Sequence, residues 1–359
     1  MGKEIVEKIL KQQKTDALLL TDAANMRFLS GFTGEGYVYL SNEKTWIVTD
    51  SRYTVAAKNT CPDSTVICWK AGDYFGPLVE AVREDDVKSL GIEDEKMTLS
   101  EYRKLREGLD KQNLTDVCLV DMKDQISVHR GVKQAWEIDL IREAESVGDR
   151  AFERLLPELR AGMTEKQVAA RIEFYMKEEG AEGFSFDTIA ASGLNSAMPH
   201  AVPTDKKLEQ GDFLTMDFGC LYHGYCSDMT RTVVIGKASE KQRKVYDTVL
   251  LAQKTAMDQM RPGMTGRQID ALARDVIREA GYGEYFGHSL GHSVGLEIHE
   301  RPVFSKNEKT VIQPGMVITV EPGIYIENFG GVRIEDVVVI TENGCESLAH
   351  SPKELIEIL

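Results

Sequence analysis

Histidines are concentrated in one short stretch of the sequence, GHSLGHSVGLEIHERP, at residues 287–302. The chain has seven histidines, and three of them, His288, His292 and His299, fall within this stretch. Imidazole nitrogens bind metal ions and exchange protons near neutral pH, and the glycines let the backbone come close to an ion or a substrate. The stretch therefore predicts a metal site or a substrate site. For any one histidine, a solvated loop position is the alternative.

Four acids stand in predicted strands of the second half of the chain. Asp217 lies in GDFLTMDFG and Glu321 in GMVITVEPG, and each strand is followed by a second one with another acid, Asp228 or Glu335. A buried acid is costly unless a cation pairs with it, and neighbouring acids raise each other's pKa values. Four carboxylates with one or two imidazoles form a ligand set for two divalent ions roughly 3.5 Å apart. Asp336 points to the face opposite Glu335, so we expect it to be a solvated acid or an ion-pair partner.

An internal duplication accounts for the positions of these acids. RAGMTEKQV begins at residue 160 and RPGMTGRQI at residue 261, and each has a Thr three residues before a Gln, the capping box that begins a helix. Apolar residues then recur at helical spacing until Gly180 or Gly281 ends the helix. A longer amphipathic helix is expected ahead of each copy, at residues 135–156 and 240–260, with strands after it. This order predicts a pseudo-twofold α+β domain in which two half-sheets meet at the centre.

The first 130 residues alternate short apolar runs with helical patterns, which predicts a smaller α/β domain. We expect strands at 16–22, 36–41, 44–50, 64–69 and 115–121, and helices at 51–60, 76–84 and 99–109. The polar stretch QISVHRGVKQ, residues 125–134, is interpreted as the connection to the next domain. The predicted domains are residues 1–130, which contain no chemical motif, and residues 131–359.

Composition excludes several classes of function. At 359 residues the chain is long enough for two domains, and its net charge of −15 argues against a nucleic acid or an anionic membrane as partner. No apolar run approaches the roughly 20 residues that span a bilayer, and no signal-peptide pattern opens the chain. The six cysteines form no CxxC pair. We therefore expect a cytoplasmic protein with reduced thiols.

Five segments of the second half, taken together, resemble the pita-bread (creatinase-fold) metallopeptidases, in the branch of Xaa-Pro aminopeptidases and prolidases: MDFG, SDMTRT, GHSVGLEIHERP, VEPGIY and VRIEDVVVIT. The resemblance covers residues 134–359 strongly. The first 130 residues resemble, more weakly, the creatinase-type N-terminal domain of that branch. The implied metal ligands are Asp217, Asp228, His292, Glu321 and Glu335. In the family the second aspartate and the last glutamate bridge two ions, here Asp228 and Glu335.

The resemblance also implies roles around the metal site. His200, His288 and His299 match histidines that hold the substrate and stabilise its developing charge. Arg333 and Tyr325 resemble the pair that orients the first metal-binding aspartate. Ordinary packing and a surface ion pair are the alternative for this pair.

These features predict an exopeptidase that cleaves the Xaa-Pro bond at the N-terminus of peptides with proline at the second position. A hydroxide between two divalent ions would be the nucleophile, with manganese as the expected metal and cobalt or zinc as alternatives. Glu321 would pass a proton from the water to the leaving nitrogen, and His299 would stabilise the oxyanion. The family also implies a homodimer.

Peptide length is the main question that the sequence leaves open. Many dipeptidases of this branch carry an arginine shortly after the HE motif, which can hold the C-terminal carboxylate of a dipeptide. In HERPVFS, Arg301 precedes the proline and Val303 follows it. The sequence therefore favours an Xaa-Pro aminopeptidase, with a prolidase (Xaa-Pro dipeptidase) as the alternative. A non-catalytic binding protein with this fold is a more distant alternative, because all five ligand positions are filled.

Overall fold

The computed structural model describes residues 2–359. The chain forms two compact units, an N-terminal unit that ends at Arg130 and a C-terminal unit that begins at Gly131. Among the described residues, no helix is both long and apolar enough to cross a membrane.

The N-terminal unit is built on one mixed sheet with the strand order β4-β3-β2-β1-β5-β6. β1 pairs antiparallel with β2 and parallel with β5. The strands are β1 (Ala17–Leu20), β2 (Gly36–Ser41), β3 (Thr45–Thr49), β4 (Thr65–Cys68), β5 (Ser89–Ile92) and β6 (Cys118–Asp121). The helices are α1 (Gly2–Gln13), α2 (Ala23–Ser30), α3 (Thr54–Thr60), α4 (Gly76–Glu84), α5 (Leu99–Lys111) and α6 (Gln125–Arg130).

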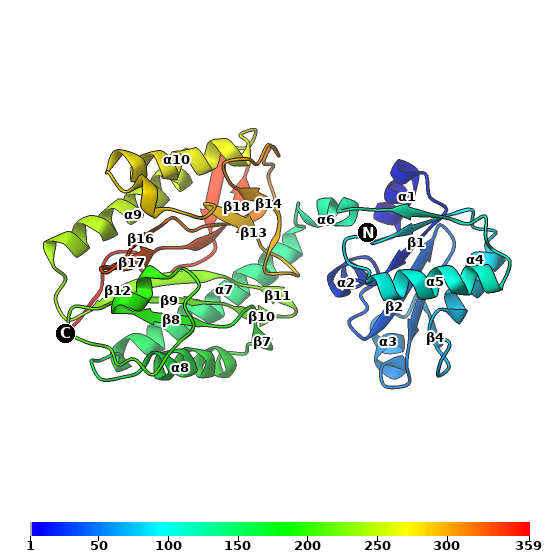
Figure 1. The fold of residues 1–359 in the computed structure, drawn as a ribbon, viewed down its shortest axis with the longest axis horizontal. Helices are drawn as coiled ribbons and strands as arrows, with labels where there is room; N and C mark the ends of the chain where they lie inside the picture. Colours follow the sequence, from blue (N-terminus) through cyan, green and yellow to red (C-terminus); the bar gives the residue numbers. More distant parts are fainter. Residues whose placement is uncertain (1) are drawn as a thin grey trace. The chain divides into compact units, whose positions relative to one another are not determined.

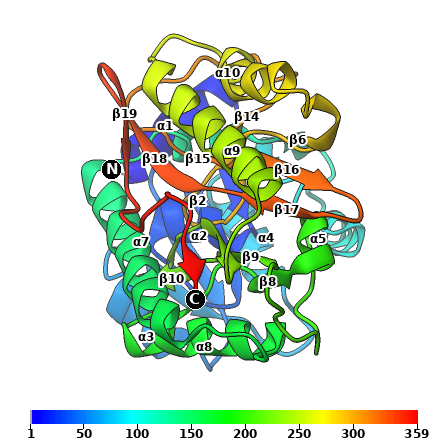
Figure 2. The ribbon, with the colours of Figure 1, turned by 90° about the vertical axis from the view of Figure 1, so that its left-hand side faces the viewer.

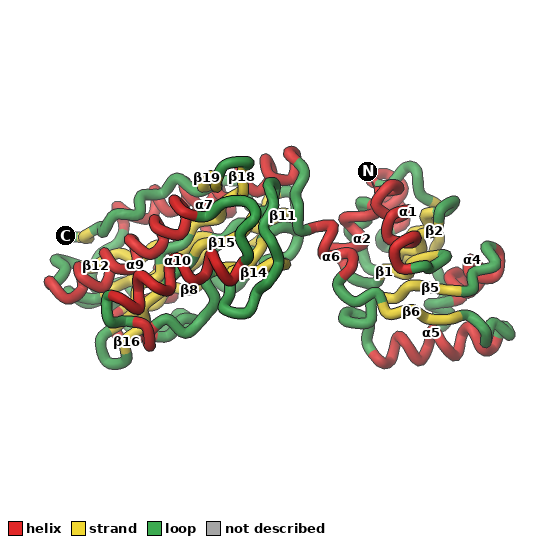
Figure 3. Tube along the Cα trace, turned by 90° about the horizontal axis from the view of Figure 1, so that it is seen from above, coloured by secondary structure: helices red, strands yellow, loops and turns green. Residues whose placement is uncertain are grey.

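Helices cover both faces of this sheet because its strands carry apolar side chains on both sides. Leu19 and Tyr39 pack with α4 and α5 on one face. Leu18 and Leu40 pack with α1, α2, α3 and α6 on the other face. Figure 3 shows α1 and α5 on opposite sides of β1, β5 and β6. The two-faced burial is the usual property of an α/β layer.

The five strands and three helices predicted in this unit are confirmed, with small differences at their ends. The sequence did not predict β5, α1 or α2, which are short or flanked by charged residues. The interpretation of residues 125–134 as a plain connection is wrong in part, because residues 125–130 form α6. Ile126 and Arg130 of this helix are buried, and the Arg130 guanidinium donates to the Asn25 side chain at 2.9 Å.

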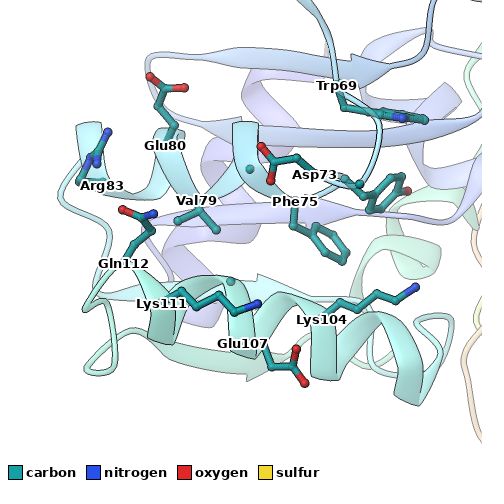
Figure 4. A pocket seen from close by; sticks show the side chains of 14 residues that line it. Trp69, Asp73, Phe75, Val79, Glu80, Arg83, Lys104, Glu107, Lys111 and Gln112 are labelled. Carbon is teal, nitrogen blue, oxygen red and sulfur yellow. The ribbon is translucent and has the colours of Figure 1, made fainter.

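A groove of about 700 Å³ lies between α4 and α5 of the N-terminal unit. Trp69 and Phe75 stand at its aromatic end, and the labelled side chains of both helices border it (Figure 4). Its charged residues are three cations and three acids: Arg83, Lys104, Lys111, Asp73, Glu80 and Glu107. The groove therefore carries no net charge that would select a charged ligand.

The C-terminal unit holds two half-sheets between pairs of helices (Figures 1 and 2). One half-sheet has the order β20-β12-β9-β8 and the other β14-β13-β15-β18-β19. The strands of the first are β8 (Ile189–Ser192), β9 (Phe213–Phe218), β12 (Met229–Ile235) and β20 (Glu357–Ile358). Those of the second are β13 (Gly291–Ser293), β14 (Glu300–Phe304), β15 (Val317–Val320), β18 (Asp336–Thr341) and β19 (Gly344–Ser347). Smaller sheets contain β7 (Gly183–Phe184), β10 (Cys220–Tyr222), β11 (Tyr225–Cys226), β16 (Gly323–Ile326) and β17 (Gly330–Arg333).

The helices of this unit are α7 (Ala135–Leu155), α8 (Glu165–Glu178), α9 (Glu240–Gln259) and α10 (Gly266–Glu279). α7 and α8 lie on one side of the strands, and α9 and α10 on the other (Figures 1 and 2). Both predicted capping boxes are present at α8 and α10, at Thr164 and Thr265. Gly180 and Gly281 follow these helices with positive φ angles of 108° and 87°, which glycine adopts without strain.

The central strand pairs of the two half-sheets correspond, as the duplication predicts, although one sheet has four strands and the other five. β9 and β12 pair antiparallel in one half, and β15 and β18 pair antiparallel in the other. The halves meet at β12 and β17, where the Thr232 hydroxyl donates to the Arg333 carbonyl at 2.9 Å. The predicted fold, an α+β unit with two half-sheets after a smaller α/β unit, is confirmed.

Candidate active site

The four acids come from the strand pairs at the centre of the C-terminal unit. Asp217 lies within β9, whereas Asp228 and Glu335 each immediately precede a strand, and Glu321 immediately follows one. Three of the four thus stand at strand ends and not inside strands as the sequence predicted. The halves are joined at this point, because the Glu335 backbone N–H donates to the Thr230 carbonyl at 3.1 Å.

His292 brings the acids of both halves together. One ligand atom each of Asp228, His292 and Glu335 lie within 4.8 Å of one another. Nε2 of His292 is 3.5 Å from Oδ2 of Asp228 and 3.5 Å from Oε1 of Glu321. Asp217 is near enough that its charge raises the pKa of Asp228. The structure thus collects all five predicted ligand residues in one cluster.

Without a cation, the charged form of the carboxyl groups in this cluster is unfavourable, because the groups are buried and close together. Burial, then the charge of Glu335, raises the pKa of Asp228 well above its usual value. Burial, then Glu321, raises the pKa of Glu335 in the same way. Burial raises the pKa of Glu321 to about 8, against the opposing charge of Arg333. Such a group of buried acids holds protons at neutral pH unless cations replace them.

The donor atoms fit divalent cations. Oδ1 of Asp217 is buried and has no hydrogen-bond partner among the described residues. Nδ1 of His292 lies 3.3 Å from the Ser293 carbonyl, so Nδ1 carries the proton and Nε2 presents its lone pair to the acids. Burial lowers the pKa of His292 to about 4, which keeps the imidazole neutral. Neutral imidazole nitrogen and carboxylate oxygen are suitable ligands for manganese, cobalt or zinc.

Arg333 links the acid cluster to Tyr325 and His288. Its guanidinium donates to Oδ2 of Asp217 and, at 2.7 Å, to the Tyr325 hydroxyl. The Tyr325 hydroxyl lies 3.0 Å from Nε2 of His288, whose Nδ1 lies 2.8 Å from the Ser289 carbonyl. Burial lowers the pKa of His288 to about 4, so this ring is neutral at physiological pH. Both ring nitrogens of His288 therefore have protein partners, and Tyr325 reaches Asp217 only through Arg333.

His200 and His299 are the exposed histidines of the site. The rings of His299 and His292 are 4.3 Å apart between centroids. His200 lies close enough to His288 to lower the pKa of that ring, as a minor cause after burial and Arg333. These two histidines are placed where a solvent-borne substrate can reach them.

Three further residues contact the site, and two of them, Thr230 and Glu145, were not found from the sequence. The Thr230 hydroxyl donates to Oε2 of Glu335 at 2.6 Å, and the Thr319 hydroxyl donates to Oε1 of Glu321 at 3.1 Å. Strand alternation places Thr319 on the same face as Glu321, two residues on, and the same argument from Asp228 could have indicated Thr230. Glu145 of α7 accepts the Asp228 backbone N–H at 2.8 Å, a contact between distant segments for which the sequence holds no signal.

Asp336 lies on the opposite face from Glu335, as predicted, and it is an ion-pair partner. Its carboxylate is fully buried, 2.7 Å from the Arg231 guanidinium and 2.6 Å from the Lys353 ammonium. Burial alone would raise the pKa of Asp336, but Arg231 and Lys353 outweigh burial and hold the pKa below its usual value. The pKa is therefore raised in Glu335 and lowered in its neighbour Asp336.

Known proteins resemble the chain over nearly its whole length. Residues 139–342 match the model of metallopeptidase family M24, and residues 4–122 match the creatinase/prolidase N-terminal domain. An Xaa-Pro dipeptidase of Pyrococcus furiosus is 42% identical, over 99% of this chain and 100% of that protein. The structure of an Xaa-Pro dipeptidase from Bacillus anthracis superposes with a TM-score of 0.94, at 41% identity over 99% of each chain. That of an X-Pro aminopeptidase from Thermotoga maritima gives a TM-score of 0.90, at 40% identity over 98% of this chain and 100% of that one.

Proposed function

The chain belongs to metallopeptidase family M24, and from this premise we propose that it is a dimetal Xaa-Pro dipeptidase, or prolidase. The observation that carries the proposal is the cluster of Asp217, Asp228, His292 and the two glutamates, in which burial and neighbouring acids raise the pKa values of Asp228 and Glu335. The names of several relatives support a dipeptidase more directly than the aminopeptidase that the sequence favoured.

The five ligand residues would hold two divalent ions per chain, with manganese as our assignment and cobalt or zinc as alternatives. Asp228 and Glu335 come from opposite halves of the duplication, so both halves would supply ligands. When bound, such ions lower the pKa of a water molecule and polarise a substrate carbonyl group.

Glu321 is the residue best suited to move a proton. Its Oε1 lies 3.5 Å from Nε2 of His292, within the cluster, and a carboxylate so placed can accept a proton and return it. It would take a proton from the attacking water and give it to the proline nitrogen that leaves. The Thr319 hydroxyl, 3.1 Å from Oε1, fixes the orientation of this carboxyl group.

The histidines divide into two groups in this proposal. His200 and His299 are exposed, so they would contact the substrate and stabilise charge on its carbonyl oxygen. His288 has both nitrogens occupied by Ser289 and Tyr325, so its first role is to hold the Tyr325 hydroxyl that binds Arg333. A substrate contact by His288 would require one of these bonds to break.

An Xaa-Pro aminopeptidase that accepts longer peptides is the second candidate, and Val303 favours it. Val303 pairs with His292 across β13 and β14, so the two side chains share one face of the sheet. Valine offers no positive charge for the C-terminal carboxylate of a dipeptide. A dipeptidase with valine here would have to recognise that carboxylate with another group.

Hydrolysis of Ala-Pro and of Ala-Pro-Ala by metal-stripped protein, with and without manganese or cobalt, tests both candidates. Cleavage of Ala-Pro alone, restored only by metal, supports the dipeptidase. Comparable cleavage of both peptides supports the aminopeptidase instead. If metal-loaded protein cleaves neither peptide, both proposals fail.

We also propose assembly as a homodimer and a cytoplasmic location, in line with the expectations from the sequence. Measurement of mass in solution by light scattering tests the dimer: a mass of one chain would contradict it.

A further inference from the structure

The segment from Ser192 to Thr204, here called the His200 loop, connects β8 to the segment that leads into β9. The large apolar side chains of this loop, Leu194, Met198 and Val202, are more than half exposed, whereas the small Ala201 is buried. His200 of this loop is one of the two exposed histidines of the site. Polar contacts therefore decide where His200 stands.

Glu165, the first residue of α8, binds both ends of the His200 loop. Its Oε1 accepts the Ser192 N–H at 2.6 Å and the Ser192 hydroxyl at 2.9 Å. Its Oε2 accepts the Thr204 N–H at 3.0 Å and the Thr204 hydroxyl at 2.6 Å. The Asn195 side-chain amide lies 3.0 and 3.1 Å from the two oxygens. One fully buried carboxylate thus closes the loop at its base.

Only an ionised carboxylate satisfies this set of donors. Burial by itself raises the pKa of Glu165, but the hydrogen bonds from Thr204, Ser192 and Asn195 outweigh it and lower the pKa. Lys206 donates to the Ser192 hydroxyl and to Asp212, not to Glu165. In a glutamine at this position, the two N–H groups of the side-chain amide would face the N–H and hydroxyl groups of Ser192 or Thr204, which are donors themselves.

The far side of the loop is attached to the acid cluster. The Ser196 hydroxyl accepts the Gly331 N–H at 2.9 Å. The Pro199 carbonyl, next to His200, accepts from the Arg333 guanidinium at 3.3 Å, and Arg333 also donates to Asp217. The His200 loop is therefore held between Glu165 at its base and the site at its tip.

The second repeat indicates that Glu165 serves the loop and not the helix start. The equivalent of Glu165 at the start of α10 is Gly266, and the capping box of α10 is complete without a side chain there. At α8 the capping box is likewise made by Thr164 and Gln167. The contacts of the Glu165 carboxylate are thus additional to those that begin the helix.

We propose that Glu165 is a positioning residue that fixes the His200 loop, so that His200 meets the substrate in the productive orientation. This inference rests on the proposed function, since it assigns a task to His200. Glu165 does not touch the substrate; it acts through the loop.

The first experiment measures the loop directly and does not depend on activity. Hydrogen–deuterium exchange of residues 193–203 is compared between the unmodified metal-loaded protein and Glu165→Gln. We expect faster exchange in this segment with unchanged exchange in β9 and β12. Unchanged exchange at 193–203 would overturn the proposal.

Matched acid-to-amide controls are available. Asp205→Asn removes an exposed ion pair with Lys166 beside the same loop, which contributes little. Glu308→Gln removes a carboxylate that accepts from Thr310 in the second repeat. Neither should change exchange at 193–203. If Glu165→Gln does not fold, Thr204→Val removes one hydroxyl donor to Glu165, together with the bond that this hydroxyl accepts from the Lys206 N–H, and should give a smaller change in the same direction.

The second experiment is a double-mutant cycle on kcat/KM for Ala-Pro. Glu165→Gln should lower kcat/KM by about 10- to 100-fold, as loss of supporting contacts around a metal site does, with unchanged metal content. Combined with His200→Ala, it should add no further loss, because both changes remove the same function. Fully additive losses would overturn the proposal. If the unmodified protein cleaves no Xaa-Pro peptide, the proposed function fails, and the exchange experiment alone decides whether Glu165 holds the loop.

Discussion

The two repeats of the C-terminal unit use the same elements for different tasks. Each begins a helix with a Thr–Gln capping box and supplies two acids, Asp217 and Asp228 in the first, Glu321 and Glu335 in the second. Only the second repeat supplies His292, the imidazole of the cluster. The duplicated features supply the acids of the cluster, whereas His292 and the contacts around the cluster differ between the repeats.

The helix starts illustrate this difference most clearly. In the first repeat, Glu165 extends from the helix to bind Thr204. In the second, Gly266 takes its place, and a Cβ there would lie 2.3 Å from the Val303 carbonyl and 2.6 Å from Cγ of Glu308. The Glu308 side chain, which comes from the loop and not the helix, fills that space. The carboxylate at this place therefore comes from the helix in the first repeat and from a loop in the second. Only in the first repeat does it bind a segment that carries a histidine of the site.

The largest effect should come from removal of the acids that join the two repeats. Asp228→Asn with Glu335→Gln removes both charges that we assign to metal ligands. We expect kcat/KM for Ala-Pro to fall by about 10³-fold or more, which corresponds to about 4 kcal/mol. Bound metal, measured by mass spectrometry, should fall below one ion per chain. Retention of metal and activity by this variant would contradict the assignment.

The residue that follows each of these acids differs between the repeats, so substitutions there should differ in their effect on stability. Met229 follows Asp228, whereas Asp336 follows Glu335 and pairs with Arg231 and Lys353. Asp336→Asn leaves the Arg231 charge buried without its partner, so we expect a loss of about 3–5 kcal/mol in the free energy of unfolding. Denaturant titration measures this. A loss below about 1 kcal/mol would show that the ion pair does not stabilise the joined halves.

The metal-free protein should lose stability as pH rises. The pKa of Glu321 is about 8 in the folded protein against an ordinary 4.5, and those of Asp228 and Glu335 are also raised. Between pH 6.5 and 8 the folded state therefore binds more protons at these acids than the unfolded state, so the free energy of unfolding falls as pH rises. Below pH 6.5 the lowered pKa values of His288 and His292 act in the opposite direction.

Melting temperature measures this trend. We expect a fall of about 4 °C between pH 6.5 and pH 8 without metal, and a smaller fall after addition of manganese. The variant that lacks the Asp228 and Glu335 charges is the control, and its fall should be smaller than that of the unmodified protein. A metal-free melting temperature that rises over this range would contradict the account.

The smallest effect concerns peptide length. Val303→Arg places a cation on the sheet face of His292. It should raise the preference for Ala-Pro over Ala-Pro-Ala by about tenfold, the range of one hydrogen bond to a charged group. Val303→Met adds length without charge and should leave the ratio unchanged. An equal response to both substitutions would exclude a carboxylate contact at this position.

Sequence patterns predicted the helices and the corresponding strands, which depend on interactions between residues close in the sequence. Capping residues and helical spacing predicted α7 to α10, and the repeated spacing of acids predicted which strands correspond. The pattern could not predict that Asp228 is held by Glu145 or that Glu165 binds Thr204, because such contacts depend on tertiary packing. The substrate role of His288 is implied by the family resemblance and stays a prediction; in the structure Tyr325 and Ser289 lie at its two ring nitrogens. α6 was missed because six residues with a polar surface carry little periodic signal.

The central claim is that the two repeats pool their acids to bind two catalytic ions. Its most direct test is titration of metal-stripped protein with manganese, with bound ions per chain and hydrolysis of Ala-Pro measured on the same samples. The account predicts no activity without metal and full activity at two ions per chain. Activity in stripped protein, or no binding of manganese, cobalt or zinc, would contradict it.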